Sequence, residues 1–468
     1  MHPRSALLAL LAVLAAGAVA AQACDGRSPG PTGPATVGRG PADQDTPEVC
    51  LDPNGNPLPI APESQRVDLG APVFSRPTRV TNPLFPIGSL FRAVFYGRVD
   101  GAPLRLETTL LSEPRTLEVD GQSVETLVSQ FVAFVDGRIH EVAIDHYAQA
   151  DDGAVWYFGE DVFDYEDGAV IGTEGTWLAG RDGPAAMIMP ANPEVGDVWR
   201  PENICGLVFE EVTATATGLT VDSPHGSVAG ALAVQELHQD GALEPKVFAP
   251  GYGEWTSGSG DNLEAVALAL PADALPGLPP KELETLSAGA AEIFDAAQGE
   301  DWESAAATAG EMSAAWDAFK AGGVPAMVET AAQDALDALS AAIAAQDAER
   351  TRQATIRVAF PTLDLKLRHR TAAETDLDLL DLWARQLVLD AAAGDANAVI
   401  GDAASLKWIR DRVARDVSLP DLQALDARLD GLRSAAAARN LTAADAGARS
   451  LRATVARTHV IGRRQSTR

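Results

Sequence analysis

Two hydrophobic patterns divide the chain near residue 280. Before that point, short runs rich in Val, Thr, Phe and Tyr recur between residues 83 and 270, which is typical of β-strands. Expected strands cover residues 90–99, 104–111, 126–135, 139–147, 211–221, 228–237, 246–249 and 263–270. Pairs such as Asp100-Gly101, Asp120-Gly121 and Asp136-Gly137 separate the first runs and favour hairpin turns. We therefore expect an antiparallel, strongly curved sheet or open barrel.

Beyond residue 280 the chain is rich in Ala, with large apolar residues at intervals of three and four, the spacing of helices. Expected helices cover residues 281–298, 301–320, 325–346, 348–369, 371–393, 395–415, 419–437 and 441–458. Asp301, Asp395 and Thr442 are the expected N-caps, and Pro361 marks an expected break. Short connections between these helices predict an all-α bundle.

The segments outside these patterns complete a multidomain β + α architecture. Residues 25–77 are dense in Gly, Pro, Ser and Asp and lack an apolar period, which predicts a flexible arm. The expected order is a signal peptide (1–23), a tether (24–77), a β half-barrel-like domain (78–270), a Pro-rich linker (271–280), a separate helical bundle (281–458) and a basic tail (459–468). Arginines without acids from Arg449 onward could contact anionic lipid or cell-wall polymer, or fray into solvent.

The N-terminus has the pattern of a bacterial export signal. His2 and Arg4 precede an apolar run at residues 7–19, which is too short for a permanent membrane anchor. Cys24 follows a small-residue cleavage site and resembles the acylated cysteine of bacterial lipoproteins. The box usually has Leu three places before the cysteine, where this chain has Ala21, so cleavage to a soluble exported protein is the alternative. We expect a lipid-tethered protein in the periplasm or on the outer cell surface.

The two remaining cysteines, Cys50 and Cys205, form an even pair. In an oxidising compartment a disulfide between them is expected, and two buried free thiols are the alternative. The net charge of −30 argues against a nucleic-acid partner, because phosphate binding needs a basic surface.

Acidic and aromatic residues alternate from Trp156 onward. Glu160, Asp161, Asp164, Glu166 and Asp167 lie between aromatic residues, as they would in a carbohydrate or calcium site. Such acids are common in hairpin turns, so a solvated turn is the expectation and cation or polar-ligand binding the alternative. If the segment binds a ligand, the candidate residues are Trp156, Tyr157, Glu160, Asp161, Trp177, Met187 and Met189.

Charged residues interrupt the apolar pattern of the helices between residues 363 and 390. Charges in so apolar a stretch must be paired or hydrated. A salt-bridge network between helices, including an Asp381–Arg385 pair, is the expectation. The alternative is a polar pocket in which His369, Glu374 and Asp378 bind a metal or an anion. His225 and His238 are expected at the surface.

Several short motifs of the β region together resemble an uncharacterised family of bacterial exported β-domains. They are Trp156-Tyr157-Phe158-Gly159-Glu160-Asp161, Gly175-Thr176-Trp177, Met189-Pro190 with Gly196-Asp197, and Ala249-Pro250-Gly251-Tyr252-Gly253. The late Pro-Gly-x-Gly is similar to one in half-barrel lipoproteins of the lipid-carrier type. The resemblance covers residues 80–270 and implies a fold and a compartment, without an activity. In the lipid carriers, the curved sheet surrounds an apolar cleft.

No catalytic motif stands out. Gly258-Ser259-Gly260 is too short for a nucleophile elbow, and no cofactor-binding pattern occurs. The sequence therefore favours a non-enzymatic envelope protein without a cofactor, which binds a lipid membrane through its acylated N-terminus and an unknown ligand or protein partner. The alternatives are a carbohydrate-active or metal-dependent enzyme that uses the acids around Glu160, and a metal-binding helical bundle.

Overall fold

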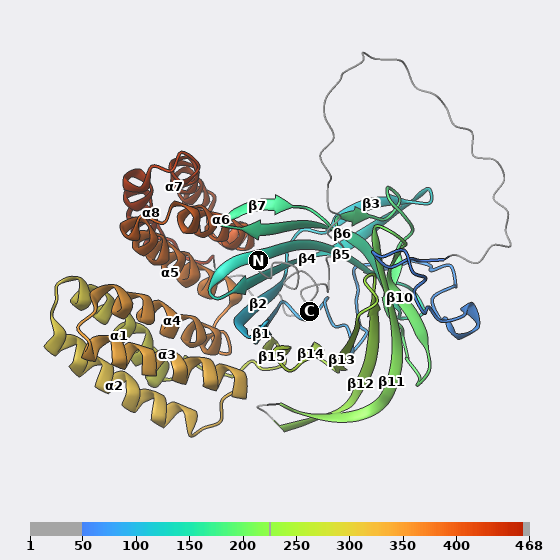
Figure 1. The fold of residues 1–468 in the computed structure, drawn as a ribbon, viewed down its shortest axis with the longest axis horizontal. Helices are drawn as coiled ribbons and strands as arrows, with labels where there is room; N and C mark the ends of the chain where they lie inside the picture. The colour runs from blue at the N-terminus through green and yellow to red at the C-terminus, as the bar shows by residue number, and fades with distance from the viewer. Residues whose placement is uncertain (1–48, 224–225, 462–468) are drawn as a thin grey trace, which may run out of the picture.

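A computed structural model describes residues 49–223 and 226–461, and it contains one large antiparallel sheet followed by a helical body (Figure 1). The main strands are β1 (Arg92–Val99), β2 (Ala102–Leu110), β4 (Gln122–Val135), β5 (Arg138–Gln149), β6 (Val155–Glu166), β10 (Val198–Ile204), β11 (Val208–Ser223), β12 (Gly226–His238), β13 (Leu243–Ala249), β14 (Gly253–Ser259) and β15 (Asn262–Leu270). The expected fold class, a curved antiparallel sheet followed by helices, is confirmed.

The strand order explains how one sheet is made from two consecutive meanders. Strands β10 to β15 are neighbours in sequence order, and β15 then pairs with β1, which continues through β2, β4, β5 and β6. A further short strand, β9 (Ala186–Met189), pairs with β6. The curvature of the sheet brings β9 beside β10. No strand pairing among the described residues joins β9 to β10, so the barrel is not closed.

Asp-Gly turns account for the tight hairpins. Asp100 and Gly101 have φ values of 49° and 77°, and the Asp120-Gly121, Asp136-Gly137 and Asp167-Gly168 pairs also have positive φ at both residues. Two consecutive residues with positive φ are what a type I′ turn requires, and its twist matches that of the flanking strands.

Six short strands were not predicted. They are β3 (Arg115–Val119), β7 (Ala169–Gly172), β8 (Trp177–Leu178), β9, β10 and β14. β3, β8 and β9 lie outside the main strand order, β7 and β10 form its two ends, and β14 lies within it.

The expected tether is wrong for its described part, residues 49–77. Val67 donates its backbone N–H to the Val198 carbonyl at 2.9 Å, and the Ser75 hydroxyl binds Asp151. These bonds hold the segment against the sheet, because they satisfy backbone groups that a free arm would leave to water. The export signal and Cys24 lie outside the described residues.

Eight helices follow the sheet within the described part of the chain. They are α1 (Lys281–Gln298), α2 (Trp302–Lys320), α3 (Ala326–Ala344), α4 (Ala348–Lys366), α5 (Ala372–Ala393), α6 (Ala396–Val413), α7 (Leu419–Ala437) and α8 (Leu441–Val455). None of these helices is both long and apolar enough to cross a membrane.

The helix boundaries agree with the capping chemistry, with two corrections. Asp301 caps α2 by accepting the backbone N–H of Ser304, and Asp395 caps α6 by accepting that of Ala398. The expected cap Thr442 is wrong, because Asn440 has this role in α8. Pro361 does not break α4, which continues to Lys366.

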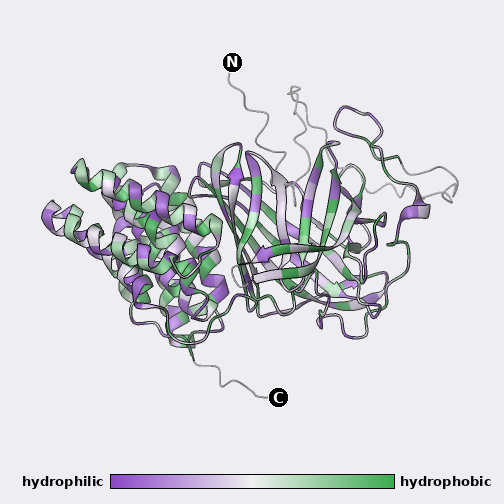
Figure 2. Cartoon of the chain, turned by 90° about the horizontal axis from the view of Figure 1, so that it is seen from below, coloured by the Kyte–Doolittle hydropathy of each residue, from purple (hydrophilic) through white to green (hydrophobic). Residues whose placement is uncertain are grey.

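The Pro-rich linker predicted a helical body separate from the sheet. This prediction is wrong, because the helices pack against the sheet. One apolar core combines Val94, Tyr96 and Leu268 of the sheet with residues of α1 to α4. A second core combines Phe134 and Val142 with residues of α5 to α8. The helices therefore cover the outer face of the sheet near β1, β2, β4 and β5, and Figure 2 shows both parts side by side from below.

Charged side chains are buried in this interface between sheet and helices. Arg92 pairs with Asp376 of α5 at 2.6 Å, and Arg105 pairs with Asp364 of α4 at 2.6 Å. Arg412 of α6 pairs with Glu107 of β2. Burial opposes ionisation of Glu107, but Arg412 and Arg105 hold its pKa far below its ordinary value. These six groups, which we call the interface network, balance three arginines against three acids.

Candidate functional site

The aromatic and methionine residues proposed as a ligand site lie in the core of the curved sheet. Trp177 and Met189 are fully buried, Tyr157 is 1% exposed, and Trp156 and Met187 are each 5% exposed. Tyr157 stacks on Tyr147 at 4.9 Å between ring centroids and meets Trp177 edge to face at 5.5 Å. The sheet thus fills much of its concave side with its own rings.

The acids of the same segment do not form a solvated turn. Glu160, Asp161 and Asp164 belong to strand β6, and only Asp167 lies in the turn that follows. Because successive side chains of a strand point to opposite faces, Glu160 is fully buried while the Asp161 side chain remains 39% exposed. Glu160 and Asp161, adjacent in the strand, are therefore on opposite faces, whereas Asp164 shares the face of Glu160.

Glu160 belongs to a larger set of ionisable residues on the concave face. Cross-strand partners share a face, and such partners connect Asp145 with Glu160, Glu202 with Glu210, Glu210 with His238, and Glu236 with Glu244. We call the following acids the interior carboxyls: Asp145, Glu160, Glu202, Glu210, Glu236, Glu244, Glu254 and Glu264. His238 and Lys246 are the cations among them.

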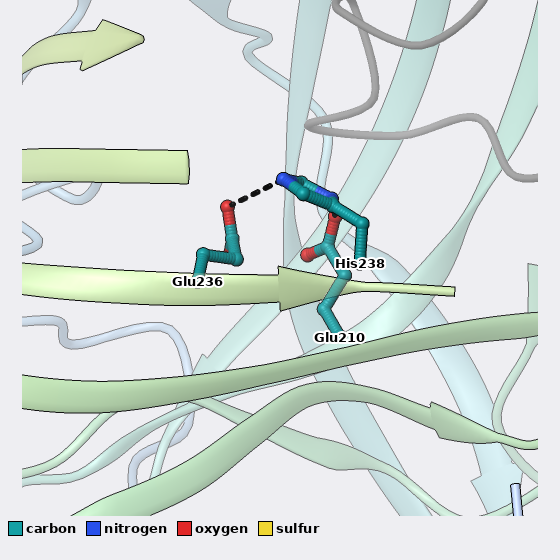
Figure 3. A group of neighbouring side chains, drawn as sticks. All are labelled: Glu210, Glu236 and His238. Atoms are coloured by element: carbon teal, nitrogen blue, oxygen red, sulfur yellow. Dashed lines mark ion pairs between the residues drawn. The ribbon is translucent and has the colours of Figure 1, made fainter. Parts of the chain in front are cut away.

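His238, expected at the surface, is instead 6% exposed at the centre of this set (Figure 3). Its Nδ1 lies 3.3 Å from Glu210, and its Nε2 lies 3.0 Å from Glu244 and 3.8 Å from Glu236. Burial opposes a charge on the ring, but the hydrogen bonds to Glu210 and Glu244 prevail and raise the pKa of His238 to about 10. His238 is therefore an imidazolium at neutral pH.

Glu210, Glu236 and His238 have the spacing of a metal site, since one ligand atom of each lies within 4.8 Å of the others. Both ring nitrogens of His238 face carboxylates, so a metal would have to displace a ring proton and one of these contacts. The Lys246 ammonium also lies against Glu236. In this structure the group is an ion network of His238 and Lys246 with their surrounding carboxyls.

The remaining interior carboxyls lack enough cations. Burial raises the pKa of Asp145 to about 7, with the Tyr157 and Ser129 hydroxyls opposing it. Burial and Glu236 raise the pKa of Glu210 to about 7. Burial, with the adjacent Glu202 carboxyl, raises the pKa of Glu160 well above its usual range. A buried carboxyl without a counter-ion keeps its proton, because the charged form is poorly solvated.

A second site is a groove in the helical body with a volume of about 1360 Å³. Its walls come from α1, α4, α5 and α8, with the turn after α4 and the segment after α8. The charged residues that line it are Lys366, Arg370, Arg385, Arg449, Arg452, Glu284, Glu374, Asp378 and Asp381, together with His369 and His459. Arginine and lysine outnumber the acids, which is the reverse of the whole chain.

At one point in the groove two arginines share a single carboxylate. Arg385 and Arg452 both bind the single carboxylate of Asp381, at 2.7 and 2.8 Å. The expected Asp381–Arg385 pair is therefore present, and Asp381 also binds Arg452 of α8. Arg449 pairs with Asp445 within its own helix at 3.0 Å, so the described end of the basic segment is helical.

Arg352 of α4 lies near Arg449 but is not one of the residues that line the groove. Its guanidinium lies 4.2 Å from the centre of the Phe294 ring, and its Nε and Nη2 are buried without a hydrogen-bond partner among the described residues. Burial and the nearby Arg449 lower its pKa, and Asp295 and Asp445 oppose this. Arg352 is therefore a buried cation beside the groove and not part of its wall.

The candidate metal ligands His369, Glu374 and Asp378 all line the groove, but Glu374 and Asp378 are engaged in other contacts. Glu374 completes a capping box with Thr371, and Asp378 binds Arg370 at 2.5 Å. Burial and Arg368 lower the pKa of His369. Within residues 49–223 and 226–461, these three do not bring their ligand atoms together as a metal site requires.

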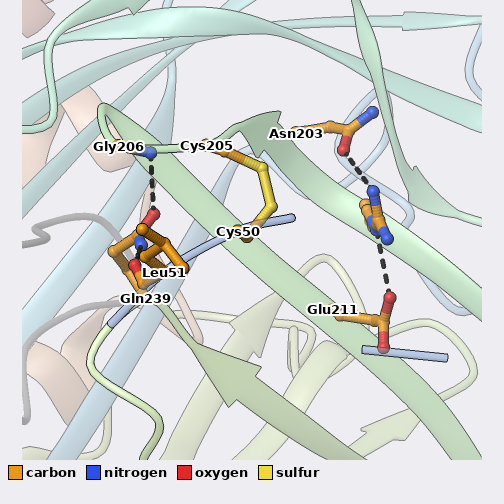
Figure 4. Close-up of a disulfide and its surroundings, with 8 residues drawn as sticks. Cys50, Leu51, Asn203, Cys205, Gly206, Glu211 and Gln239 are labelled. Atoms are coloured by element: carbon orange, nitrogen blue, oxygen red, sulfur yellow. Dashed lines mark hydrogen bonds and ion pairs between the residues drawn. A yellow bond between two sulfur atoms is a disulfide. The ribbon is translucent and has the colours of Figure 1, made fainter. Parts of the chain in front are cut away.

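The structure joins Cys50 to Cys205, with 5.1 Å between their Cα atoms (Figure 4). This separation is in the usual range for a disulfide. Cys50 packs with Leu58, Phe209 and Leu237 on the convex side of β11 and β12. The bond thus fixes the N-terminal segment to the sheet.

The interior network has a signal in the sequence, a polar residue at every second position of a strand. Glu236 and His238 are separated by one residue within a strand, and so are Glu244 and Lys246, which places each pair on one face. A polar period of two on the same face as apolar residues indicates buried ionisable groups. No known protein-family model and no curated protein matches the sequence, so the site rests on its own geometry.

Proposed function

We propose that this is an exported, non-enzymatic binding protein whose ligand is an anion held in the groove of the helical body. The observation that carries the proposal is the charge of the groove, where cations exceed acids in a chain with a net charge of −30. A locally positive groove on a negatively charged protein attracts negatively charged ligands, which the rest of the surface repels.

The size of the groove narrows the kind of anion. Its volume of about 1360 Å³ exceeds the range of ~300–1,000 Å³ that is usual for small-molecule sites. A single small anion would leave most of the space to water. The proposed ligand is therefore an extended anion, or an anionic segment of a larger molecule.

The proposed location is the cell envelope, with a lipid on Cys24. The apolar run at residues 7–19 and the cleavage site before Cys24 support export. Intact-mass analysis of the protein from its own envelope should show a lipid mass that the Cys24→Ala variant lacks. An unmodified N-terminus in the wild type would contradict the tether and leave the groove unaffected.

The alternative of an enzyme based on Glu160 has less support. A carboxyl acting as acid or base must reach its substrate, and Glu160 is fully buried beneath the rings of the concave face. Asp161 lies on the opposite face of the strand. Asp164 shares the face of Glu160, but the burial of Glu160 keeps that carboxyl from a substrate in solution.

Binding can be tested with citrate and a short poly-L-glutamate peptide by isothermal titration calorimetry at low salt. Arg452→Ala should weaken binding of the peptide by roughly 10-fold, since a charge-assisted hydrogen bond contributes about 1.5–3 kcal/mol. Arg357→Ala is the matched control, because Arg357 is exposed on α4 and does not line the groove. Absence of binding by the wild type, or equal losses in both variants, would refute the groove as the site.

A further inference from the structure

A small cavity remains on the concave face of the sheet, away from the groove. Its volume is about 110 Å³, and its charged lining consists of Asp145 from β5, Glu254 from β14 and Glu264 from β15. Aromatic rings of Phe85, Phe131 and Tyr147 form other parts of the wall. The cavity is thus both acidic and aromatic, and it lies where the two ends of the interior carboxyl set approach each other.

We infer that this cavity is a binding site for a small organic cation, such as a primary amine or a quaternary ammonium group. Three carboxyls line it without any arginine, lysine or histidine among the lining residues. The faces of aromatic rings attract cations through their quadrupole, and carboxylates supply the opposite charge. This combination suits an alkylammonium ion, which has an apolar surface and a positive charge.

The nearest protein cation is already engaged elsewhere. Lys246 lies against Glu236 and reaches Glu254 only at 4.0 Å, and it is not part of the cavity wall. Ser129 is fully buried in the wall, and its hydroxyl oxygen has no hydrogen bond of regular geometry. The hydroxyl still lies close enough to Asp145 to lower the pKa of that carboxyl. A bound primary ammonium would donate N–H groups to this oxygen and to the Asp145 carboxylate together, whereas a quaternary ammonium would bind through the charge of the carboxylates and the faces of the rings.

The protonation of the cavity acids fits a site for a cation. Burial raises the pKa of Glu264 well above its usual range, and Glu254 raises it further, while Lys246 opposes and Glu244 reinforces the effect. On the other side Asp145 lies against Tyr157 and Glu160. Binding of a cation would shift these acids to their charged form, so protons should be released into solution.

The size of the cavity limits the ligand. Since a water molecule takes up roughly 30 Å³ of liquid volume, a cavity of about 110 Å³ holds a cation of only a few heavy atoms. A hydrated divalent metal fits less well, because such ions need six or more oxygen ligands and the rings supply none. Glu254 and Glu264 are half-buried, so a ligand would enter from their side.

The test uses methylammonium and tetramethylammonium chloride with the full-length mature protein at pH 8. Thermal unfolding should shift upward by several degrees relative to sodium chloride of equal ionic strength, and calorimetry in two buffers should detect proton release. Asp145→Asn and Glu264→Gln should each reduce the affinity at least 10-fold. Asparagine is uncharged and has nearly the shape of aspartate, so Asp145→Asn should fold.

Glu166→Gln is the control, because Glu166 is exposed at the end of β6 and should leave the shift unchanged. A wild-type shift no larger than with sodium would overturn the inference. The same holds if calcium chloride stabilises the protein and the ammonium salts do not, or if the Asn and Gln variants keep the full shift. Binding of poly-L-glutamate in the groove is measured separately and does not depend on this result.

Discussion

The two faces of the same sheet both bury charges, but they solve the resulting problem differently. On the convex face, the interface network matches Arg92, Arg105 and Arg412 with Glu107, Asp364 and Asp376. On the concave face, the interior carboxyls outnumber His238 and Lys246. The first arrangement neutralises charge by pairing, and the second does so by keeping protons on carboxyls.

This difference separates a structural role from a binding role. A balanced buried pair has little to gain from an added ion, and it fixes the position of two elements that both contribute to it. Arg412 also donates to Gln130 of β4 and thus holds α6 on the sheet. Unbalanced carboxyls can exchange a proton for a cation, which is why the concave face, and not the interface, is the place where a cation should bind.

Breaking the interface network should have the largest effect. Arg412→Leu leaves Glu107 with Arg105 alone and removes the link between α6 and β2, so the free energy of unfolding should fall by about 3–5 kcal/mol. Urea denaturation at pH 7 measures it. Arg415→Leu is the control, because its side chain is 53% exposed, and it should change stability by less than ~0.5 kcal/mol. Equal effects would mean that the network adds nothing.

The protonated carboxyls of the concave face should make the stability of the protein depend on pH. The folded pKa of Asp145, about 7, exceeds its ordinary value of 3.8, so the folded state binds more protons than the unfolded state between these values. Stability from this group is complete below pH ~4 and is lost as pH rises to about 7.

Asp145→Asn should remove this loss. Relative to the wild type, the variant should gain about 2–4 kcal/mol between pH 4 and pH 8, because three pKa units correspond to roughly 4 kcal/mol at most. Denaturation at a series of pH values measures the difference. Parallel pH profiles for the two proteins would show that Asp145 is not held neutral.

The smallest effect is expected from the one ammonium of the concave face. Lys246→Met leaves Glu236 without its closest cation, which should cost about 1–3 kcal/mol at pH 8. At pH 5 the cost should shrink, since the carboxyl can take up a proton. Arg412→Leu should not recover in this way, because Arg105 still holds Glu107 ionised. Recovery of both variants at pH 5 would erase the distinction between the faces.

The sequence alone determined the local structure. Helix boundaries followed from apolar spacing and from caps such as Asp301 and Asp395, and tight hairpins followed from Asp-Gly pairs. These signals act between residues that are near in the chain, so they can be read without the fold. The Asp381–Arg385 pair was predicted because i,i+4 spacing places both on one helix face. A polar pocket at His369 was only the alternative prediction.

Only the tertiary structure decided which charges are buried and with what partners. Arg92 and Asp376 are 284 residues apart in the chain, and nothing near either residue indicates the other. The sequence predicted His238 at the surface, near a strand end. In the fold, β11 and β13 place Glu210 and Glu244 beside its two ring nitrogens. The pKa values, and with them the binding properties we infer, depend on burial and on charges across strands, which a linear sequence does not specify.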